Sequence, residues 1–330
     1  MGSNLLVTGG GGFIGSHLCE ELVRRGDAVR ALVHYNGRGD IGQLDNVPAE
    51  IRNEIEVVMG DITDPFALRD TMSGSEVVFH LAALIAIPYS YVAPHSFFAT
   101  NTLGTVHMLQ AARDEGVTRV VHVSTSECYG SAQTIPISED HPLVAQSPYA
   151  ASKIGADQAA GSFWRAFGVP VVTVRPFNTF GPRQSARAIV PTIITQALTD
   201  GTVRLGALEP TRDLTYVTDT AAGMIAAADA PDAVGETINL GTGDHVSIGD
   251  LATRIFDLLE RSGVHAHIEH DPGRVRPRNS EVERLCSDPS KAKRLLGWKP
   301  EVSLTDGLVA TIAAIRSDLD SYPRVGTYQR

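Results

Sequence analysis

The chain has 330 residues, of which 43% are hydrophobic, and carries 38 acidic residues against 28 lysines and arginines. This length exceeds the size at which a single hydrophobic core usually splits, so we expect one large or two unequal domains. The acidic balance argues against nucleic-acid and anionic-membrane partners, which need a basic surface, so any bound phosphate must be held by a few particular groups.

Short β-branched runs alternate with longer amphipathic stretches in the first half of the chain. The runs predict strands at residues 5–7, 29–33, 55–58, 77–81, 119–123 and 171–175. Helical spacing predicts helices at residues 14–23, 101–115 and 149–167. Strands that alternate with helices are typical of a parallel sheet with crossover helices. We therefore predict an α/β fold with a Rossmann-like, doubly wound parallel sheet.

The pattern changes after Asn178, where Gly181-Pro182-Arg183 predicts a turn. Beyond it we predict a helix at 190–199, a loop or short strand at 205–211, a strand at 238–240, and capped helices at 247–259 and 288–298. Because a core-like strand returns this late, the smaller C-terminal domain should be interleaved with the first. We place the first domain at residues 1–177 plus about 213–243, and the second at about 178–212 plus 244–330.

A glycine-rich run directly follows the first predicted strand. Gly9, Gly12 and Gly15 lie at the start of a helix whose apolar side chains share one face. Glycines let the backbone turn and approach a pyrophosphate, whose charge is stabilised at the helix N-terminus. Since the run begins a strand–helix–strand unit, we predict a dinucleotide site at these glycines together with Phe13 and Ile14.

The acidic residue that usually binds the adenosine ribose, at the end of the second strand, is missing. Asn36 and Arg38 follow that strand instead. Asn36 could hydrogen-bond a free ribose hydroxyl, whereas Arg38 could meet a 2′-phosphate or be a solvated loop charge. We expect NAD and leave NADP open.

Two further segments are candidates for the cofactor site. Asp61 and Ile62 come where the end of the third strand would meet the adenine. The small, apolar run Leu81-Ala82-Ala83 would let the backbone lie close to the cofactor.

Tyr149 and Lys153 are four residues apart and so share one face of a predicted helix. The ammonium can lower the pKa of the phenol and make Tyr149 a proton acceptor for an alcohol. Glu127 lies at the end of an apolar strand, where a carboxylate can remove a carbon-bound proton that a ketone has acidified. The Tyr-Lys pair therefore predicts the oxidation of an alcohol, and Glu127 predicts a second step.

Over essentially its whole length the chain resembles the extended short-chain dehydrogenases/reductases. The resemblance rests on the glycine run, Asp61-Ile62, residues 80–83, Asn101, the Tyr149 and Lys153 pair, residues 175–178 and residues 212–217. Within that family, residues 124–130 resemble the active-site run of nucleotide-sugar 4,6-dehydratases. Residues 148–157 and 181–187 resemble most closely the N-acetylglucosamine nucleotide 4,6-dehydratases of legionaminic-acid-type pathways.

The resemblance implies 4,6-dehydration of a nucleotide-linked N-acetylhexosamine with no net redox change. Tyr149, helped by Lys153 and by a hydrogen bond from Thr125, takes the C4 hydroxyl proton as hydride leaves C4 for the nicotinamide. The resulting ketone acidifies the C5–H bond. Glu127 then removes the C5 proton, water leaves from C6, and the hydride returns to C6.

The resemblance also implies further contacts. Asn101 and Pro176 join the cofactor site. The nucleotide diphosphate would be bound by Arg212 and Arg276, with Arg187 as a further candidate. Asn178 and the backbone near Ile189 and Val190 would line the same cleft.

One residue departs from the usual dehydratase pattern. Many dehydratases carry Asp where this chain has Ser126, and the GDP-mannose 4,6-dehydratases are similar to it in having serine. A hydroxyl is too weak an acid to protonate a leaving group alone. Either Glu127 returns the proton it has taken, or Ser126 orients a water or the C6 hydroxyl. We favour Glu127 in both roles, because one carboxylate can reach adjacent carbons on one face.

Other functions stay open at this point. A UDP-glucuronate decarboxylase shares a Thr-Ser-Glu run, a C4 epimerase would not need Glu127, and a silent NAD-binding sensor or scaffold would not need the Tyr-Lys pair. Cys128 is expected to be a small buried hydrophobe rather than a nucleophile. His265, His267 and His270 lack a further ligand, so we expect no metal.

The remaining expectations concern location and assembly. Three cysteines without metal-site spacing favour a reducing cytoplasm over a disulfide framework. We expect neither a secretory signal nor a membrane span, because residues 5–8 already predict a strand and no apolar run approaches about 18 residues. The family resemblance implies a homodimer in which the helices starting near Asn101 and Tyr149 pack against their copies.

Overall fold

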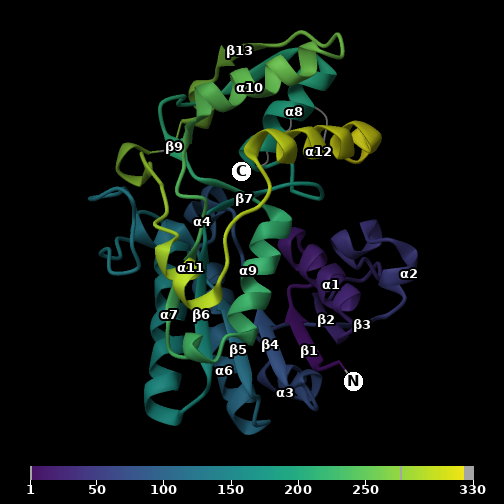
Figure 1. Ribbon diagram of the computed structural model, residues 1–330, viewed down its shortest axis with the longest axis vertical. Helices are drawn as coiled ribbons and strands as arrows, with labels where there is room; N and C mark the ends of the chain where they lie inside the picture. The colour runs from purple at the N-terminus through teal and green to yellow at the C-terminus, as the bar shows by residue number, and fades with distance from the viewer. Residues whose placement is uncertain (1, 276, 323–330) are drawn as a thin grey trace.

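A seven-stranded sheet forms the centre of the molecule (Figure 1). The computed structural model describes residues 2–275 and 277–322. The strands of this sheet are β1 (Asn4–Thr8), β2 (Ala28–His34), β3 (Ile55–Gly60), β4 (Val77–His80), β5 (Arg119–Val123), β6 (Val171–Pro176) and β11 (Thr237–Leu240). They lie in the order β11-β6-β5-β4-β1-β2-β3, and every neighbouring pair is parallel. The predicted doubly wound parallel sheet is confirmed.

The direction of strand addition reverses between β1 and β4. From β1 the chain adds β2 and β3 on one side, whereas β4, β5 and β6 extend the sheet on the other. Thr8 and His80 pair at the carboxyl ends of β1 and β4. In open α/β sheets, ligands bind outside the carboxyl ends of the strands at such a reversal. The topology therefore fixes where a site should form.

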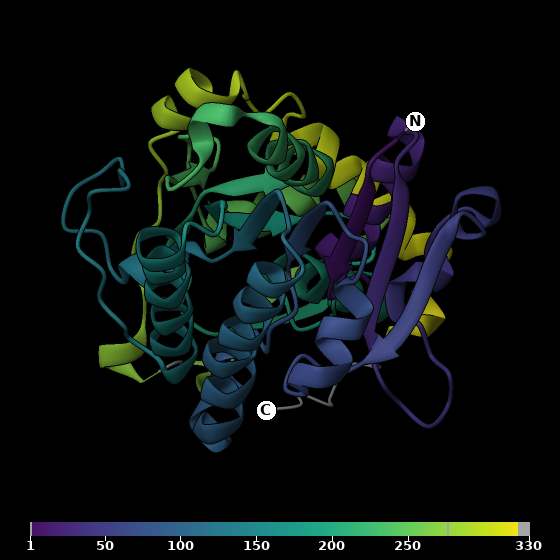
Figure 2. The same ribbon diagram turned by 90° about the horizontal axis from the view of Figure 1, so that it is seen from below.

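Helices cover both faces of the sheet (Figures 1 and 2). On one face lie α1 (Phe13–Arg25) and α9 (Val217–Asp229), and on the other α3 (Pro65–Met72), α6 (Gly104–Asp114) and α7 (Pro148–Phe167). Successive strand side chains point to opposite faces, so within the first core, which surrounds the sheet, Val7 packs on the side of α1 and α9 and Leu6 on the side of α3, α6 and α7. Both faces are buried, which explains why the strands are almost continuously apolar.

A second hydrophobic core lies outside the large sheet. It joins α8 (Ile189–Thr199), α10 (Ile248–Glu260) and α12 (Leu304–Ser317), which Figure 1 shows above the sheet. Short two-stranded sheets accompany these helices: β7 (Asn178–Phe180) pairs with β10 (Leu214–Tyr216), β9 (Thr211–Arg212) with β12 (Val246–Ser247), and β8 (Thr202–Leu205) with β13 (His267–His270).

The domain boundaries drawn from the sequence stay a prediction. Phe180 and Leu214 belong to the second core. Ala292 in α11 (Ser290–Leu296) and the following Trp298, which the sequence placed in the second domain, pack into the first core beside α9. The C-terminal segment thus contacts both parts of the molecule.

Asp213 joins three chain segments that cross between these parts. Its carboxylate accepts hydrogen bonds from the backbone N–H groups of Thr242 (2.9 Å), Gly243 (3.0 Å) and Ser287 (3.0 Å), and from the Thr242 hydroxyl (2.7 Å). The residue is fully buried (0% exposed). A buried carboxylate with this many donors fixes the relative position of the segments, including Arg212 before it.

The structure corrects the sequence-based prediction in several helices. The predicted helix at 101–115 is preceded by α4 (Ile87–Val92), α5 (Pro94–Phe97) and a π-helical segment, Phe98–Leu103, and α6 starts only at Gly104. Apolar spacing does not distinguish a π turn from an α turn. The sequence analysis also missed α2 (Ala49–Arg52), α3, α9 and α12. No helix in the described ranges is long and apolar enough to cross a membrane.

Candidate active site

The glycine run forms a cradle at the carboxyl end of β1. Gly9 has a φ of 75°, and a Cβ there would lie 2.8 Å from the backbone nitrogen of Ala82. At Gly15 a Cβ would lie 2.2 Å from the Gly9 carbonyl oxygen. Gly12 precedes α1, and no side chain in the described residues caps its first turn, which consists of Phe13, Ile14 and Gly15. The open N–H groups of this turn fit a pyrophosphate.

The loop after β2 uses the side chain of Asn36 for its own closure. The Asn36 Oδ1 accepts hydrogen bonds from the backbone N–H groups of Arg38 (3.1 Å) and Asp40 (3.0 Å), and its Nδ2 donates to the Asp40 carbonyl (2.7 Å). Arg38 is exposed. In this conformation the amide of Asn36 holds the loop in shape. Its predicted contact with the ribose stays a prediction, as does that of Arg38.

The other predicted cofactor residues lie at the carboxyl edge of the sheet. Asp61 follows β3, and its Oδ1 accepts two hydrogen bonds from Thr63, each of 2.8 Å. Ile62 beside it is buried (5% exposed). The half-buried run 81–83 follows β4, and the Ala82 N–H donates to the Thr8 hydroxyl (3.2 Å). The backbone around Ala82 therefore closes one side of the glycine cradle.

The start of α7 positions Tyr149. Ser147 precedes the helix, and its hydroxyl accepts a hydrogen bond from the Ala150 N–H (3.1 Å), while Pro148 occupies the first turn. Tyr149 thus lies in the first turn of a well-capped helix. Its ring is 7% exposed and packs edge-on against Phe97, with 6.2 Å between the ring centroids.

Lys153 lies one turn further along α7 and is almost fully buried. It is 3% exposed, and its Nζ donates a 2.8 Å hydrogen bond to the carbonyl of Val123, the last residue of β5. The sequence prediction that Tyr149 and Lys153 share one helical face agrees with these positions on α7. The hydrogen bond ties the lysine to the strand that leads into residues 124–127.

Thr125 connects this strand end to Tyr149. Its hydroxyl accepts the Glu127 N–H (3.2 Å) at the start of a 3-10 turn, Ser126–Tyr129, and its side chain lies close enough to Tyr149 to lower the pKa of the phenol. Ser126 is buried (3% exposed), whereas Glu127 is only half-buried. The Glu127 charge is close enough to Tyr149 to affect its pKa. Phenol, hydroxyl and carboxylate therefore gather at one point.

The electrostatics of the pair depend on burial. Burial raises the pKa of the Tyr149 phenol above its ordinary value, and the hydrogen bond with Thr125 opposes that rise. Burial lowers the pKa of Lys153, and the nearby Asp157 carboxylate opposes that fall. A buried phenol and a buried amine both resist ionisation. An alcohol oxidation that uses Tyr149 as a base therefore depends on the groups around Lys153.

Asn101 lies in the π-helical segment Phe98–Leu103 and is buried (1% exposed). Its Oδ1 accepts the Leu84 N–H (2.8 Å), and its Nδ2 donates to the Leu84 carbonyl (2.9 Å) and to the Ser152 hydroxyl (2.9 Å). These contacts tie the loop after β4 to α7 between Tyr149 and Lys153. The structure thus links the predicted cofactor residue Asn101 to both sides of the site.

The predicted substrate residues lie on several segments after β6, which ends at Pro176. Asn178 begins β7, and its Oδ1 is buried without a hydrogen-bond partner among the described residues. Ile189 and Val190 begin α8, and Arg187 is exposed just before it. Arg276 lies outside the described residues.

Arg212 is buried rather than extended into solvent (6% exposed). Its Nη1 donates to the carbonyls of Thr211 (2.9 Å) and Val282 (2.8 Å), and its Nη2 lies 3.2 Å from Glu281 Oε1. These contacts hold the guanidinium between β9 and the segment that follows residue 276.

The sequence analysis missed a set of buried polar side chains beneath Lys153. Asp157 contacts His122 on β5 and Arg175 on β6. Two signals were present in the sequence: Asp157 is four residues after Lys153, and His122 interrupts an otherwise apolar strand. Neither shows by itself that the side chains meet, because the contacts join separate strands and a helix.

Comparisons with known proteins agree with this geometry. Residues 6–311 match the family model described as GDP-mannose 4,6 dehydratase. The chain is 36% identical over 321 residues to a dTDP-glucose 4,6-dehydratase from Actinoplanes sp., covering 95% of this chain and 98% of that protein. It is 33% identical to a UDP-glucose 4-epimerase from Mycolicibacterium smegmatis, with 94% and 98% covered.

Among solved structures, the fold is similar to the crystal structure of DesIV, a dTDP-glucose 4,6-dehydratase from Streptomyces venezuelae, with NAD bound. The TM-score is 0.84 at 32% identity, with 97% of this chain and 98% of that chain covered. The chain belongs to the extended short-chain dehydrogenase/reductase family of nucleotide-sugar dehydratases and epimerases.

Proposed function

We propose that this protein is an NAD-dependent 4,6-dehydratase of a nucleotide-linked N-acetylhexosamine. The observation that carries the proposal is the position of Glu127, a half-buried carboxylate on the turn capped by Thr125, where both side chains are close enough to Tyr149 to act on the pKa of its phenol. A base for an alcohol and a second base for a carbon-bound proton are thereby held together. Oxidation without elimination would need only the first.

NAD fits the cradle formed by Gly9, Gly12 and Gly15, because a side chain at Gly9 or Gly15 would collide with backbone. When bound, NAD accepts the hydride from C4 and returns it to C6. The closed loop at Asn36 and the exposed Arg38 offer no ready-made pocket for a 2′-phosphate, which favours NAD over NADP. Release of the bound dinucleotide by denaturation and its identification by mass checks this assignment.

In the first step Tyr149 accepts the proton of the C4 hydroxyl. Lys153 stabilises the phenolate by its positive charge, and Thr125 stabilises it by a hydrogen bond. Enclosure of the pair among buried side chains strengthens both interactions, since the local dielectric is low.

In the second step Glu127 removes the proton from C5 and delivers it to the leaving C6 hydroxyl, so that one water departs and a C5–C6 double bond forms. When hydride is added to C6, C5 takes up one proton, which balances the proton that Tyr149 accepted from the C4 hydroxyl. Ser126 is 3% exposed, whereas Glu127 is half-buried, which supports the carboxylate rather than the serine as the group that reaches the substrate. C5 and C6 are adjacent, so a single carboxylate can serve both positions.

The substrate assignment rests on the region after β6. Asn178 Oδ1 is buried and lacks a partner in the described part of the chain, so it is available to a bound sugar or nucleotide. The protein carries a net negative charge, so particular cations must neutralise the diphosphate of the nucleotide sugar. Arg212, with Arg187 and Arg276, would do so. The N-acetylhexosamine itself is inferred from the resemblance at residues 148–157 and 181–187.

The mass of the product tests the proposal. The protein is incubated with UDP-, GDP-, dTDP- and CDP-linked sugars, with and without a 2-acetamido group. A dehydratase yields a product lighter by one water, a decarboxylase one lighter by carbon dioxide, and an epimerase one of unchanged mass. A product of unchanged mass with inverted configuration at C4 would replace the proposal with the epimerase alternative. That alternative is the activity named for the Mycolicibacterium relative, a UDP-glucose 4-epimerase.

We further propose a homodimer in which α6 and α7, which lie side by side (Figure 2), pack against their copies. Exposed apolar side chains support this: Phe98 is 43% exposed and Leu103 50% in the helical segment that leads into α6. Leu103→Asp should then shift the mass measured by light scattering from dimer to monomer. Phe66→Asp on α3, a residue 76% exposed, is the control and should leave the mass unchanged.

A further inference from the structure

Asp157 lies one helical turn after Lys153 on α7 and is 7% exposed. Its Oδ1 lies 3.0 Å from His122 Nε2 on β5. Its Oδ2 accepts hydrogen bonds from Arg175 on β6, at 3.1 Å from Nε and 2.9 Å from Nη2. Ser124, which follows β5, lies close enough to this carboxylate to lower its pKa as well. The Asp157 carboxylate is therefore fixed by donors from two strands, β5 and β6.

Further hydrogen bonds hold these donors in place. Arg175 Nη1 donates to the Tyr129 hydroxyl (2.9 Å), which donates to Asn239 Oδ1 (2.7 Å). Tyr129 ends the 3-10 turn that carries Glu127, and Asn239 lies on β11. The network thus spans β5, β6, β11 and the catalytic turn, and it leaves Asp157 little freedom to move.

Lys153 needs a negative charge nearby. Its only hydrogen bond among those between described residues is to the carbonyl of Val123, which is neutral. Burial lowers the pKa of Lys153, and the Asp157 carboxylate is the group that opposes this most. Without such a carboxylate, a buried amine tends to lose its proton.

The two histidines, Cys128 and Arg175 beside this region do not supply that charge, and the Glu127 carboxylate acts on Tyr149 rather than on Lys153. His80 on β4 and His122 on β5 stack with 5.8 Å between their ring centroids, and burial lowers the pKa of both, so they are neutral near pH 7. Burial raises the pKa of Cys128 to about 12, which keeps the thiol protonated. Arg175 is a cation. Asp157, by contrast, is held ionised by these donors, with its pKa lowered to about 2.

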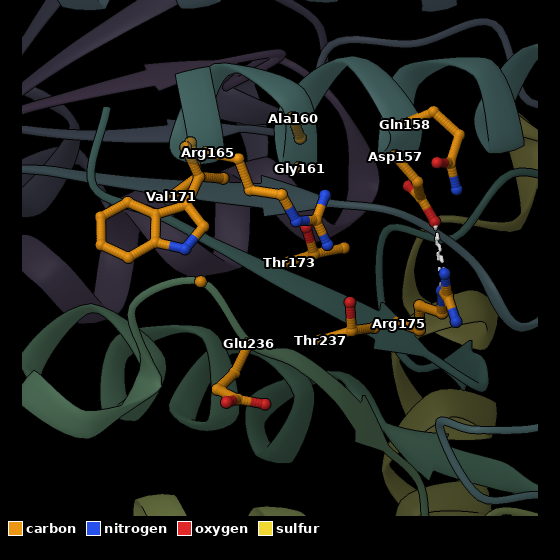
Figure 3. A pocket seen from close by; sticks show the side chains of 12 residues that line it. Asp157, Gln158, Ala160, Gly161, Arg165, Val171, Thr173, Arg175, Glu236 and Thr237 are labelled. Carbon is orange, nitrogen blue, oxygen red and sulfur yellow. Dashed lines mark hydrogen bonds and ion pairs between the residues drawn. The ribbon is translucent and has the colours of Figure 1, made fainter. Parts of the chain in front are cut away.

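A cavity of about 90 Å³ reaches this pair from the side of α7, β6 and the segment 235–237 (Figure 3). Asp157 and Arg175 lie at one end of it, joined by their ion pair, and Glu236 lines the other side (Figure 3). The cavity is large enough for water, which would hydrate the ion pair and lower the cost of keeping its charges buried.

We propose that Asp157 is a positioning residue of the active site, whose carboxylate keeps Lys153 positively charged and thereby allows Tyr149 to act as a base. Arg175 and His122 fix the carboxylate for that task. The inference rests only on the C4 oxidation in the proposed function, and it extends the active site to a residue that touches neither substrate nor cofactor.

The test follows the ionisation of Tyr149 without any substrate. The ultraviolet absorption of tyrosinate is recorded across pH for the holoenzyme and for Asp157→Asn, and in each case the same curve for a Tyr149→Phe version is subtracted. The Asp157 charge by itself raises the pKa of Tyr149, so its direct removal would move the midpoint downward. The proposal requires that loss of the Lys153 charge outweighs this effect, so the Tyr149 midpoint should move upward by about 1 to 3 pH units. A midpoint that stays in place or moves downward overturns the proposal.

Two variants guard against a purely structural effect. Glu236→Gln removes a carboxylate from the same cavity, one that pairs with Lys291 at 2.7 Å, and should leave the midpoint unchanged. If Asp157→Asn does not fold because Arg175 is left unpaired, the double variant with Arg175→Leu removes both charges and should show the same upward shift. Asp157→Glu should restore the midpoint toward that of the parent.

The same variants separate this inference from the proposed function. If no nucleotide sugar is turned over, the titration of Tyr149 still decides the role of Asp157. If dehydration is observed but the midpoint does not respond, only the role of Asp157 is lost.

Discussion

At the scale of single residues, Tyr149 and Lys153 must both carry charge inside the protein if Tyr149 is to act as a base, although burial opposes ionisation. Tyr149 is 7% exposed and Lys153 3%. Burial opposes the charge on each, and the Thr125 hydrogen bond and the Asp157 carboxylate oppose that effect. Glu127 is only half-buried, so its carboxylate stays accessible to a substrate.

Glu127 and Ser126 are the two candidates for the group that protonates the leaving hydroxyl, and the first prediction distinguishes them. Glu127→Gln should slow water loss by about 100- to 10,000-fold, the usual contribution of a general acid or base, while reduction of the bound cofactor by substrate persists. The measurement pairs product mass with cofactor absorbance in a single turnover. Ser126→Ala is the comparison, and a larger loss in that variant than in Glu127→Gln would transfer the acid role to the serine.

The sequence was sufficient for the residues whose chemistry shows in local spacing. Tyr149 and Lys153 share a helical face, and Gly9, Gly12 and Gly15 follow a strand. Asp157 was not predicted, because its role depends on His122 and Arg175, which are distant in sequence and meet only when β5, β6 and α7 pack. The hydrogen bonds by which Asn36 closes its loop could not be predicted from residue spacing either.

At the scale of elements, the start of α7 determines where Tyr149 lies. Ser147 caps the helix two residues before Tyr149 through a hydrogen bond to the Ala150 N–H. Ser147→Ala should lower the free energy of unfolding by about 1 kcal/mol, as measured by urea denaturation. Ser162→Ala, in the same helix but exposed and bonded only within its own turn, serves as control and should cost much less.

Elements with strong local signals were predicted well. Every strand of the large sheet overlaps a run that predicted a strand, and α10 begins after its predicted cap, Ser247. α9 was missed although its alanines favour a helix, because in the described chain its start has no side-chain cap. α12 does carry a start signal, since Ser303 accepts the Asp306 N–H (3.1 Å), and this signal was overlooked.

At the scale of the whole molecule, His17 lies where α1 meets the turn after β7. Its Nε2 is 3.0 Å from the carbonyl of Pro182, and the neighbouring Arg183 donates to Glu20 on α1 (2.6 Å). Burial, assisted by the Arg183 charge, lowers the pKa of His17 from 6.5 to about 4. This contact joins the glycine-rich helix to the segment that leads into α8.

The shifted pKa predicts a pH dependence of stability. Between pH 6.5 and about 4 the unfolded chain binds a proton at His17 that the folded protein does not, so stability falls as pH falls, by at most about 3 kcal/mol. His17→Gln, which can still donate to the Pro182 carbonyl, should flatten this part of the curve of unfolding free energy against pH. An unchanged slope would contradict the assignment, and His265→Gln, at an exposed site, should keep the parent slope.

The central claim is that one active site oxidises C4, eliminates water across C5 and C6, and returns the same hydride to C6. The most direct test uses a nucleotide-linked N-acetylhexosamine with deuterium at C4 and determines the product by mass spectrometry and NMR. The account predicts a 4-keto-6-deoxy product that has lost one water and carries the deuterium on C6. A product of unchanged mass with deuterium still on C4, or one that has lost carbon dioxide, would contradict it.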